Sequence, residues 1–502
     1  MKTTVYSTSK NLNNYYLDIH KNIVGYAHPL LAWVNQFESQ NGTFDQIPES
    51  INIEGVSQFT KKEIQYYYGK YKFLKDFGLN SEKVRVNDFY TPLAPDLIEY
   101  KIANLNQLTL EVTDACNLNC NYCGYSEFYY THDKRENKIM PFEVAKRIID
   151  YLVEKWNSSL NSSYKGICYI SFYGGEPLLC IPLIKKIINY VNSLYINREI
   201  IFSMTTNAVL LDKYEDFLVE NKIRILISLD GNEYNNSYRV DHSGKSSFVR
   251  IYRNVKHIAE KHPVYFENCV NFNSVLHNRN SVEEIHNFIK KEFNKIETIS
   301  PLNDFGIQKN KLDEFKKMYK NYLTDLNQSK HSKEIIADLF IKAPQTHDLI
   351  LFMTLFSGTI YRSYSDFFTD DEKRAKLLTG TCIPFGKKMF VTVNGKILPC
   401  EKISQEFGLG QVNEKNIYID PIKIADKYNS YFQKMVKQCS YCYQAKSCSQ
   451  CLFNIHDLHD NNPTCFGFEN YSMFAKYLSS TISYLEDHPE LYKTILRETI
   501  ME

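Results

Sequence analysis

The sequence predicts an α/β protein whose centre is a partial (β/α)6 barrel, similar in plan to a TIM barrel. Three observations predict this fold. Strand-like and helix-like segments alternate from about residue 105 to about residue 300, which is typical of a parallel sheet. Six strand-like segments occur there, rather than the eight of a closed barrel. A small α+β region precedes them, and a loop-rich region with seven cysteines follows at residues 380–470.

Residues 1–100 are expected to form a separate α+β module. The segment Tyr15–Ala27 alternates between apolar and polar positions, as strands do. Two helices should follow. The second is expected to begin at a capping box formed by Thr60 and Glu63, three residues apart, and to end near Gly78, since glycine suits a helix C-terminal cap.

Residues 101–304 are expected to form the barrel, and polar side chains at the C-terminal ends of its strands are expected to carry the chemistry. The expected strands are Leu108–Val112, Tyr169–Tyr173, Ile200–Thr205, Ile223–Leu229, Val264–Leu276 and Ile296–Ile299. Amphipathic patterns predict helices between them, for example at Phe142–Trp156, Leu183–Leu194 and Phe248–Glu260.

The remaining segments complete the predicted domain organisation. Val86–Tyr100, which contains two prolines, is expected to be a linker. Residues 305–378 are expected to form a helical bridge, and residues 379–470 a cysteine-rich domain. Residues 471–502 are expected to be helical.

Composition narrows the class of protein. The net charge is +1 with 23% charged residues and no basic stripe, which argues against nucleic acid as a partner. No secretory signal is visible at the N-terminus, and no apolar run approaches the roughly 20 residues that span a bilayer. We therefore expect a cytoplasmic protein without a membrane partner. Ten of its 13 cysteines fall into two groups with short spacings, which indicates metal binding rather than disulfides.

The first cysteine group is C-x3-C-x2-C, formed by Cys116, Cys120 and Cys123 in the loop after the first expected barrel strand. Three thiolates are one fewer than the four that normally hold a [4Fe–4S] cluster, which leaves one iron open. A zinc site is the structural alternative, but structural zinc sites are closed by four ligands.

This spacing resembles the radical S-adenosylmethionine (SAM) superfamily, and further segments over residues 105–300 match that family in order. The segment Phe172–Pro177 reads FYGGEP and is similar to the family's GGEP motif. The resemblance implies a [4Fe–4S] cluster that binds SAM, with Gly174, Gly175 and Glu176 at the SAM amino group. A carboxylate is suited to an ammonium group.

The resemblance also implies further SAM contacts. Ser203 and Asn207 match a polar cluster near the ribose, Ser228 and Arg239 match residues that contact the SAM carboxylate, and Tyr122 lies within the cysteine motif. Each of these polar residues has an alternative structural role as a strand-end cap or turn residue.

Two positions depart from the family pattern. Ala208 stands where a glycine is common, and Asn235-Asn236 stands where relatives often have His-Asp, with a spacing to Arg239 that is one residue shorter. The second departure bears directly on the role assigned to Arg239.

The second cysteine group resembles the SPASM domain, which carries two auxiliary [4Fe–4S] clusters. A zinc ribbon is the alternative for four of its cysteines. The resemblance implies that auxiliary cluster I is held by Cys382, Cys400 and Cys451, and auxiliary cluster II by Cys439, Cys442, Cys448 and Cys465. The remaining cysteines, Cys168, Cys180 and Cys269, are expected to be buried small hydrophobic residues.

Together these resemblances imply an enzyme that receives an electron from a reductant such as flavodoxin or ferredoxin, cleaves SAM to a 5′-deoxyadenosyl radical and removes a hydrogen atom from its substrate. The N-terminal module is similar in size and order to winged-helix elements that bind a leader peptide as an added strand. The expected function is maturation of a ribosomally made precursor peptide (leader plus core) by a thioether, a carbon–carbon crosslink or another oxidation. The alternatives are an anaerobic sulfatase-maturating activity and a non-catalytic iron–sulfur electron carrier.

Auxiliary cluster I has only three matched cysteines, so a substrate cysteine could bind its open iron as a thiolate. Glu401 directly follows Cys400 and is the candidate catalytic base for the proton that must leave. Its structural alternative is an exposed surface carboxylate.

Overall fold

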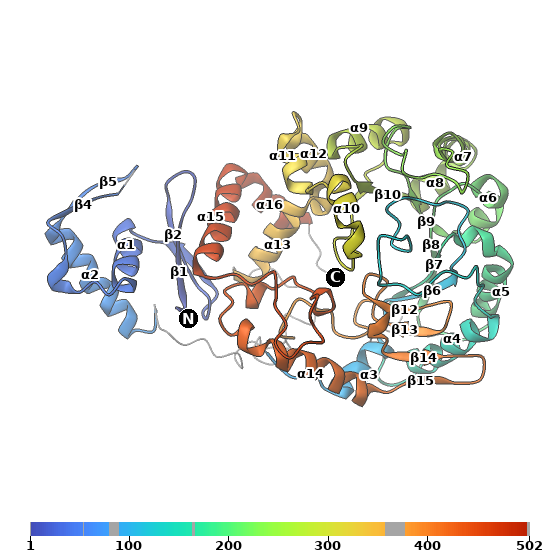
Figure 1. The fold of residues 1–502 in the computed structure, drawn as a ribbon, viewed down its shortest axis with the longest axis horizontal. Coiled ribbons are helices and arrows are strands. Elements are labelled where there is room, and N and C mark those ends of the chain that lie inside the picture. Colours follow the sequence, from blue (N-terminus) through green and yellow to red (C-terminus); the bar gives the residue numbers. More distant parts are fainter. Residues whose placement is uncertain (1, 54, 80–89, 163–165, 357–376, 499–502) are drawn as a thin grey trace.

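The computed structural model describes residues 2–53, 55–79, 90–162, 166–356 and 377–498, and its centre is a ten-stranded sheet (Figure 1). Six consecutive strands of that sheet are parallel and lie in sequence order, which confirms the partial barrel. These strands are β6 (Gln107–Thr113), β7 (Ile167–Gly174), β8 (Glu199–Thr206), β9 (Arg224–Ser228), β10 (Val270–Leu276) and β11 (Thr298–Pro301).

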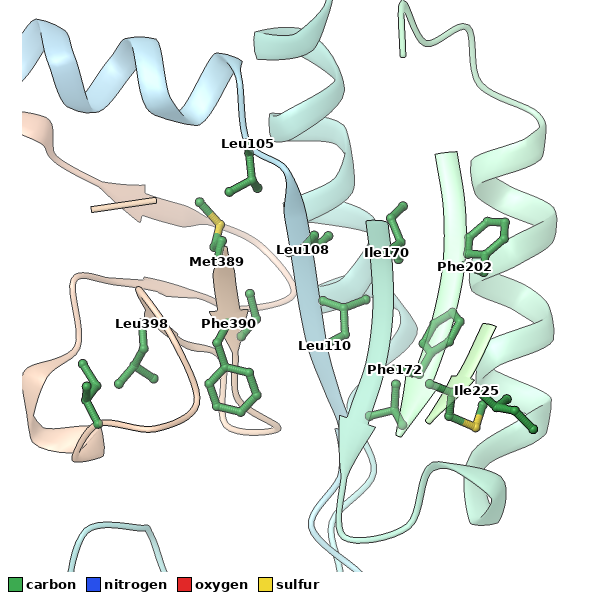
Figure 2. Packing of buried hydrophobic residues seen from close by; sticks show 14 of the residues in the cluster. Leu105, Leu108, Leu110, Ile170, Phe172, Phe202, Ile225, Met389, Phe390 and Leu398 are labelled. Atoms are coloured by element: carbon green, nitrogen blue, oxygen red, sulfur yellow. The ribbon is translucent and has the colours of Figure 1, made fainter. Parts of the chain in front are cut away.

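Helices cover the outer face of these strands (Figure 1). They include α4 (Phe142–Trp156), α5 (Ile181–Asn192), α6 (Leu211–Glu220), α7 (Phe248–Lys261) and α9 (Val282–Phe293). Alternate strand residues such as Leu108, Leu110, Ile170 and Phe172 are buried in the core that these helices close (Figure 2). The intervening residues face the barrel lumen and include polar side chains such as that of Ser171.

The predicted strand at Val264–Leu276 is wrong in its first half. Residues 264–269 belong to helix α8 (Pro263–Cys269), and only β10 continues as a strand. Pro263 occupies the first helical turn, where its missing N–H costs nothing. The strand-favouring residues Tyr265 and Phe266 are buried from this helix, so tertiary packing overrides their local preference.

The expected linker at Val86–Tyr100 is partly a helix. Residues 86–89 lie outside the described residues, and α3 (Pro95–Ala103) begins at Pro95. Ile98 and Ile102 are fully buried, and α3 packs against α14 (Pro421–Cys439). The segment therefore attaches the barrel to the cysteine-rich region rather than separating two units.

The sheet continues into the cysteine-rich region, which the sequence does not indicate. Strand β12 (Met389–Val391) pairs parallel to β6, with Phe390 opposite Thr109. The sheet then extends through three antiparallel strands, β13 (Lys396–Leu398), β14 (Gly410–Val412) and β15 (Ile417–Ile419). This pairing joins the cysteine-rich region to the barrel in one sheet, with β12 between β6 and β13, the strand that precedes Cys400.

The region after the barrel is helical where the structure describes it, as expected. Its helices are α10 (Leu312–Met318), α11 (Tyr322–Gln328), α12 (Ser332–Leu339) and α13 (Pro344–Phe356), and residues 357–376 lie outside the described residues. The chain ends in α15 (Tyr471–Asp487) and α16 (Pro489–Glu498). Within the described ranges, every helix is too short or too polar to cross a bilayer.

The N-terminal region contains a three-stranded antiparallel sheet, a hairpin and two helices. These are β1 (Thr4–Thr8), β2 (Asn14–Asp18), β3 (Ile23–Tyr26), α1 (Pro29–Ser39), β4 (Ser50–Ile53), β5 (Ser57–Thr60) and α2 (Lys61–Asp76). The capping box is confirmed, because the Glu63 carboxylate accepts from the Thr60 backbone N–H at 2.8 Å. Gly78 adopts a φ of 80° after the helix end, as a C-terminal cap requires.

This region is not a separate module. One face of its sheet packs on α1 and α2, through Tyr6 and Leu30. The other face shares a core with α13 and α15, in which Val5 and Leu17 meet Phe352 and Phe474. Figure 1 shows α15 beside β1 and β2. Deleting residues 1–100 would therefore expose an apolar surface on the rest of the chain.

A buried ion cluster joins α9 to α12. His286 is 2% exposed and lies 3.2 Å from the Glu297 carboxylate and 3.1 Å from Asp338, which also pairs with Lys290. Burial lowers the pKa of His286, but Glu297 and Asp338 outweigh it and raise the pKa above its usual value.

A raised folded-state pKa stabilises the fold below the unfolded value of about 6.5, and this contribution is lost as the pH rises through the folded-state value. The stability of the wild-type protein should therefore fall between about pH 6.5 and mildly alkaline pH, and His286→Gln should flatten that slope. Urea denaturation across this range measures it, and equal slopes in both proteins would contradict the prediction.

Candidate functional site

The loop after β6 brings the first three cysteines together at the C-terminal edge of the barrel. Its backbone is held by the loop after β9, since the Asn119 N–H donates to the Val240 carbonyl at 2.7 Å. Burial raises the pKa of Cys116 to about 11 and that of Cys120 to about 12, and the neighbouring thiols raise both further. The Cys116 and Cys120 thiols are therefore poor acids without a cation, and bound iron would stabilise them as thiolates.

The GGEP turn packs directly on this cysteine loop. A Cβ atom on Gly174 or Gly175 would lie 2.0 Å from the carbonyl oxygens of Thr113 and Ala115, respectively. Gly174 also has a φ of 137°, which L-residues with side chains rarely adopt. The Gly175 N–H donates to the Thr113 carbonyl at 2.8 Å. Both glycines are therefore required for the turn to approach the loop.

Glu176 is fully buried beneath the turn. Its carboxylate accepts from the Leu178 N–H, the Thr206 hydroxyl and the Asn207 N–H at 2.7–3.0 Å. Burial raises the pKa of Glu176 to about 7, although these donors oppose the shift. The carboxylate thus ties the turn to the end of β8, and only Oε2 retains capacity for another donor such as an ammonium group.

Asn207 lies beside the cysteine loop, whereas Ser203 does not. The Asn207 side-chain amide donates to Asn117 at 2.7 Å. Ser203 lies in the middle of β8, where its hydroxyl pairs with that of Ser171 at 2.6 Å. The next residue after Asn207, Ala208, has a φ of 59°, which explains physically why a glycine is favoured at this position.

Arg239 is committed to a buried ion pair with Asp230. Its Nε and Nη2 donate to the two Asp230 oxygens at 3.0 and 2.9 Å. Tyr122 also donates to Asp230. Only Nη1 of Arg239 is left outside this pair, so a SAM carboxylate would meet one nitrogen rather than the bidentate fork. Ser228 lies at the end of β9 with its side chain half-buried.

Sequence reasoning missed Asp230 as the centre of this network, although its position directly after a barrel strand was a usable signal. Its carboxylate also accepts from the Val275 N–H at 2.9 Å and lies 3.7 Å from His277. Burial would raise the pKa of Asp230, but Arg239 and His277 outweigh it and hold the pKa at about 2.

The structure brings the second cysteine group together in two interleaved sets. Cys382, Cys400 and Cys451 all lie near the buried ring of Tyr428. Cys439 lies near the other set, Cys442, Cys448 and Cys465. These are the two sets that the resemblance implies. Burial raises the pKa of Cys400 to about 11 and that of Cys439 to about 12, so both sets are suited to a metal that stabilises thiolates.

Glu401 is not an exposed surface carboxylate. Its side chain is 18% exposed, and both oxygens lie 3.1 Å from the Lys388 ammonium. Burial raises the pKa of Tyr173, and Glu401 and Cys123 raise it further because both lie nearby. Tyr173 thus lies near both Glu401 and Cys123 of the first cysteine group. Lys388 and Tyr173 were not singled out from the sequence.

The comparisons with known proteins agree with this geometry. The Radical SAM superfamily matches residues 110–291. Over 147 residues the chain is 40% identical to an uncharacterized protein of Methanocaldococcus jannaschii, MJ0907, covering 29% of this chain and 46% of that protein. Over 245 residues it is 28% identical to the radical SAM cyclopropyl synthase TigE of Paramaledivibacter caminithermalis, covering 46% of each. The chain thus spans about half the length of the curated relatives it matches.

Among solved structures, anSMEcpe with bound AdoMet aligns over 78% of this chain and 100% of its own length, with a TM-score of 0.54 and 21% identity. That likeness concerns the fold. A radical SAM domain implies a [4Fe–4S] cluster and SAM, and the three converging thiols beside the glycine turn fit both. Residues 110–291 of this chain are a radical SAM domain.

Proposed function

We propose that the protein is a radical SAM maturase of a ribosomally made peptide. When bound, the cluster and SAM would supply a radical that takes hydrogen from an unactivated carbon. Cys116, Cys120 and Cys123 would hold the cluster, and the GGEP turn would position SAM. Glu401 would accept the proton released when the new bond forms, while Lys388 keeps its carboxylate in place.

The observation that carries the peptide substrate is a free strand edge in the N-terminal sheet. In β3, Gly25 and Ala27 face β2, because the Ala27 N–H donates to Asn14 and the ladder alternates. Val24 and Tyr26 therefore direct their backbone N–H and C=O groups away from β2. Within the described part of the chain no strand pairs with this edge, and Tyr26 is 78% exposed.

The opposite edge of the same sheet is closed by α15. The Tyr6 N–H donates to the Tyr471 hydroxyl at 3.0 Å, and the Thr8 carbonyl accepts from the Ser479 hydroxyl at 2.6 Å. Side-chain hydroxyls thus occupy the backbone groups that an added strand would need. Of the two edges of this three-stranded sheet, only β3 is therefore open among the described residues to an extended leader peptide, at which main-chain hydrogen bonds can provide affinity.

Val24→Pro tests this proposal. Proline removes one outward N–H without touching the β2–β3 ladder, and edge strands tolerate it. Affinity for the product of a short open reading frame beside the gene should fall at least about tenfold, since one main-chain hydrogen bond and its neighbours are lost. Fluorescence anisotropy of the labelled peptide measures it.

Thr8→Pro is the matched control, because it makes the same change on the edge that α15 already closes. Its affinity should equal that of the wild type. Equal affinity in Val24→Pro and the wild type would reject strand addition at β3. Anaerobic incubation of the same peptide with enzyme, SAM and reductant, followed by mass spectrometry, tests the activity. Formylglycine formed on a sulfatase-derived peptide, with no change in the precursor peptide, would favour sulfatase maturation instead.

Glu401→Gln should lower the rate of peptide modification by about 10²–10⁴-fold, because glutamine cannot accept the proton. SAM cleavage in the absence of peptide should be unchanged. Glu406→Gln is the control, since that carboxylate pairs with His459 at the surface. A Glu401→Gln enzyme that modifies the peptide at the wild-type rate would exclude Glu401 as the base.

A further inference from the structure

A second cluster of metal-binding side chains lies on the outside of the barrel, away from every cysteine of the two groups. Glu215 and Asp216 are on α6, and His262 is the residue at which α7 ends and α8 begins. One ligand atom from each of the three lies within 4.8 Å of the others. A carboxylate pair with an imidazole is a donor set that transition metals bind.

Two of these atoms are buried without a hydrogen-bond partner among the described residues. They are Oε2 of Glu215 and Nε2 of His262. Glu215 as a whole is only 7% exposed. Buried polar atoms are almost always paired, because an unpaired one loses its hydration without compensation. Two such atoms on residues of one cluster of possible ligands indicate that a group other than a protein side chain satisfies them.

The charged groups around the cluster have a net negative charge, which favours binding of a cation. The other oxygen of Glu215, Oε1, lies 2.5 Å from Lys261 and 3.3 Å from His257. Lys261 also lies 3.2 Å from Asp216. One ammonium thus balances two carboxylates, and the pair retains a net charge of −1 before His257 and His262 are considered. Lys261 is 42% exposed, so its ammonium is free to move into solvent.

We infer that Glu215, Asp216 and His262 form a binding site for a divalent transition-metal ion such as Zn²⁺. The imidazole nitrogen favours Zn²⁺ over Mg²⁺ or Ca²⁺, which prefer oxygen ligands alone. Tetrahedral Zn²⁺ with bonds of about 2.0–2.1 Å needs ligand atoms about 3.3 Å apart. Nε2 of His262 lies 4.0 Å from the Asp216 carboxylate. The Asp216 side chain is 75% exposed, so it can rotate towards His262 to reach the shorter separation.

The site would tie α6 to the turn between α7 and α8. Glu215 and Asp216 lie in the middle of α6, and His262 lies at the C-terminal end of α7. None of the three belongs to the cysteine loop or to the GGEP turn. Metal binding is therefore expected to stabilise the outer layer of the barrel without affecting SAM cleavage. This separation distinguishes the inference from the proposed function, since either can fail alone.

The experiment is an anaerobic titration of the cluster-loaded enzyme with ZnCl₂, followed by calorimetry and thermal unfolding. Loading the clusters first keeps the cysteines occupied. The wild type should bind one Zn²⁺ outside the cysteine groups and unfold at a higher temperature with it. His262→Gln and Asp216→Asn should each weaken Zn²⁺ binding at least about 100-fold, because each removes a direct ligand. Losing a residue that only orients a ligand costs less, about 10–100-fold. Lys261→Met should tighten binding about tenfold, because a competing cation is removed.

His331→Gln is the matched control, because His331 forms an exposed pair with Glu283 at 2.6 Å. Its titration should match that of the wild type. Asp216→Asn changes an exposed side chain, so it is expected to fold even if His262→Gln does not. The inference is overturned if the wild type binds no Zn²⁺, or if the folded Asp216→Asn variant binds it with unchanged stoichiometry and affinity.

Discussion

Replacing Cys116, Cys120 and Cys123 together by alanine is expected to abolish reductive cleavage of SAM and to remove about four irons per chain. The reason is that the three thiols converge at the carboxyl edge of the barrel, in the loop on which the GGEP turn packs. Iron analysis and chromatographic detection of 5′-deoxyadenosine measure the two outcomes after anaerobic reconstitution.

The matched control replaces three cysteines outside both groups, Cys168, Cys180 and Cys269, by alanine. Cys168 and Cys180 are buried as expected, and Cys269 is half-buried. This variant should keep its full iron content per folded chain, although it should unfold more easily. Unchanged 5′-deoxyadenosine production by the first variant would contradict the assignment of the cluster, whereas equal iron losses in both variants would show only that the fold is damaged.

Asp230→Asn is expected to lower the free energy of unfolding by about 3–5 kcal/mol, because it leaves the Arg239 guanidinium buried without its counter-charge. The carboxylate is fully buried and holds Arg239, Tyr122 and the Val275 N–H together. Urea denaturation at neutral pH measures the loss. A loss well below 1 kcal/mol would contradict the role of Asp230 as the centre of the network.

The stability of the same variant should also depend differently on pH in the acid range. The depressed pKa of Asp230, at about 2, stabilises the wild type above its unfolded value of about 3.9, and that contribution disappears as the pH falls through about 2. Asp230→Asn should lack this part of the acid-induced loss. The double variant Asp230→Asn/Arg239→Met should be more stable than Asp230→Asn alone, because no uncompensated charge remains.

A further variant, Arg239→Lys, separates two roles for Arg239. If Nη1 binds the SAM carboxylate, Arg239→Lys should weaken SAM binding in folded protein beyond any change in stability, because lysine cannot hold Asp230 with a fork and reach a second acceptor. If Arg239 only stabilises the loop, SAM affinity per folded chain should stay unchanged.

Local patterns in the sequence determined the elements whose causes are local. The amphipathic period of Phe142–Trp156 places α4 at those residues, and the Thr60–Glu63 capping box sets the start of α2. The spacing of Cys116, Cys120 and Cys123 likewise marks the first metal site, because a short loop keeps the three thiols close whatever surrounds it. Where local preference was ambiguous, as at Val264–Cys269, the sequence predicted a strand and the structure has a helix.

Only the tertiary structure decided how distant segments meet. The ion pair between Glu401 and Lys388 lies near Tyr173 of β7, and neither side chain has a local signal for that position. The burial of Glu176 and the capture of Arg239 by Asp230 depend on neighbouring loops in the same way. Among the described residues, β3 is the edge of its sheet that stays unpaired, and this is also a tertiary result, because α15, far along the chain, closes the β1 edge. Side-chain type and spacing identify what chemistry is available, but long-range packing determines which groups are free to perform it.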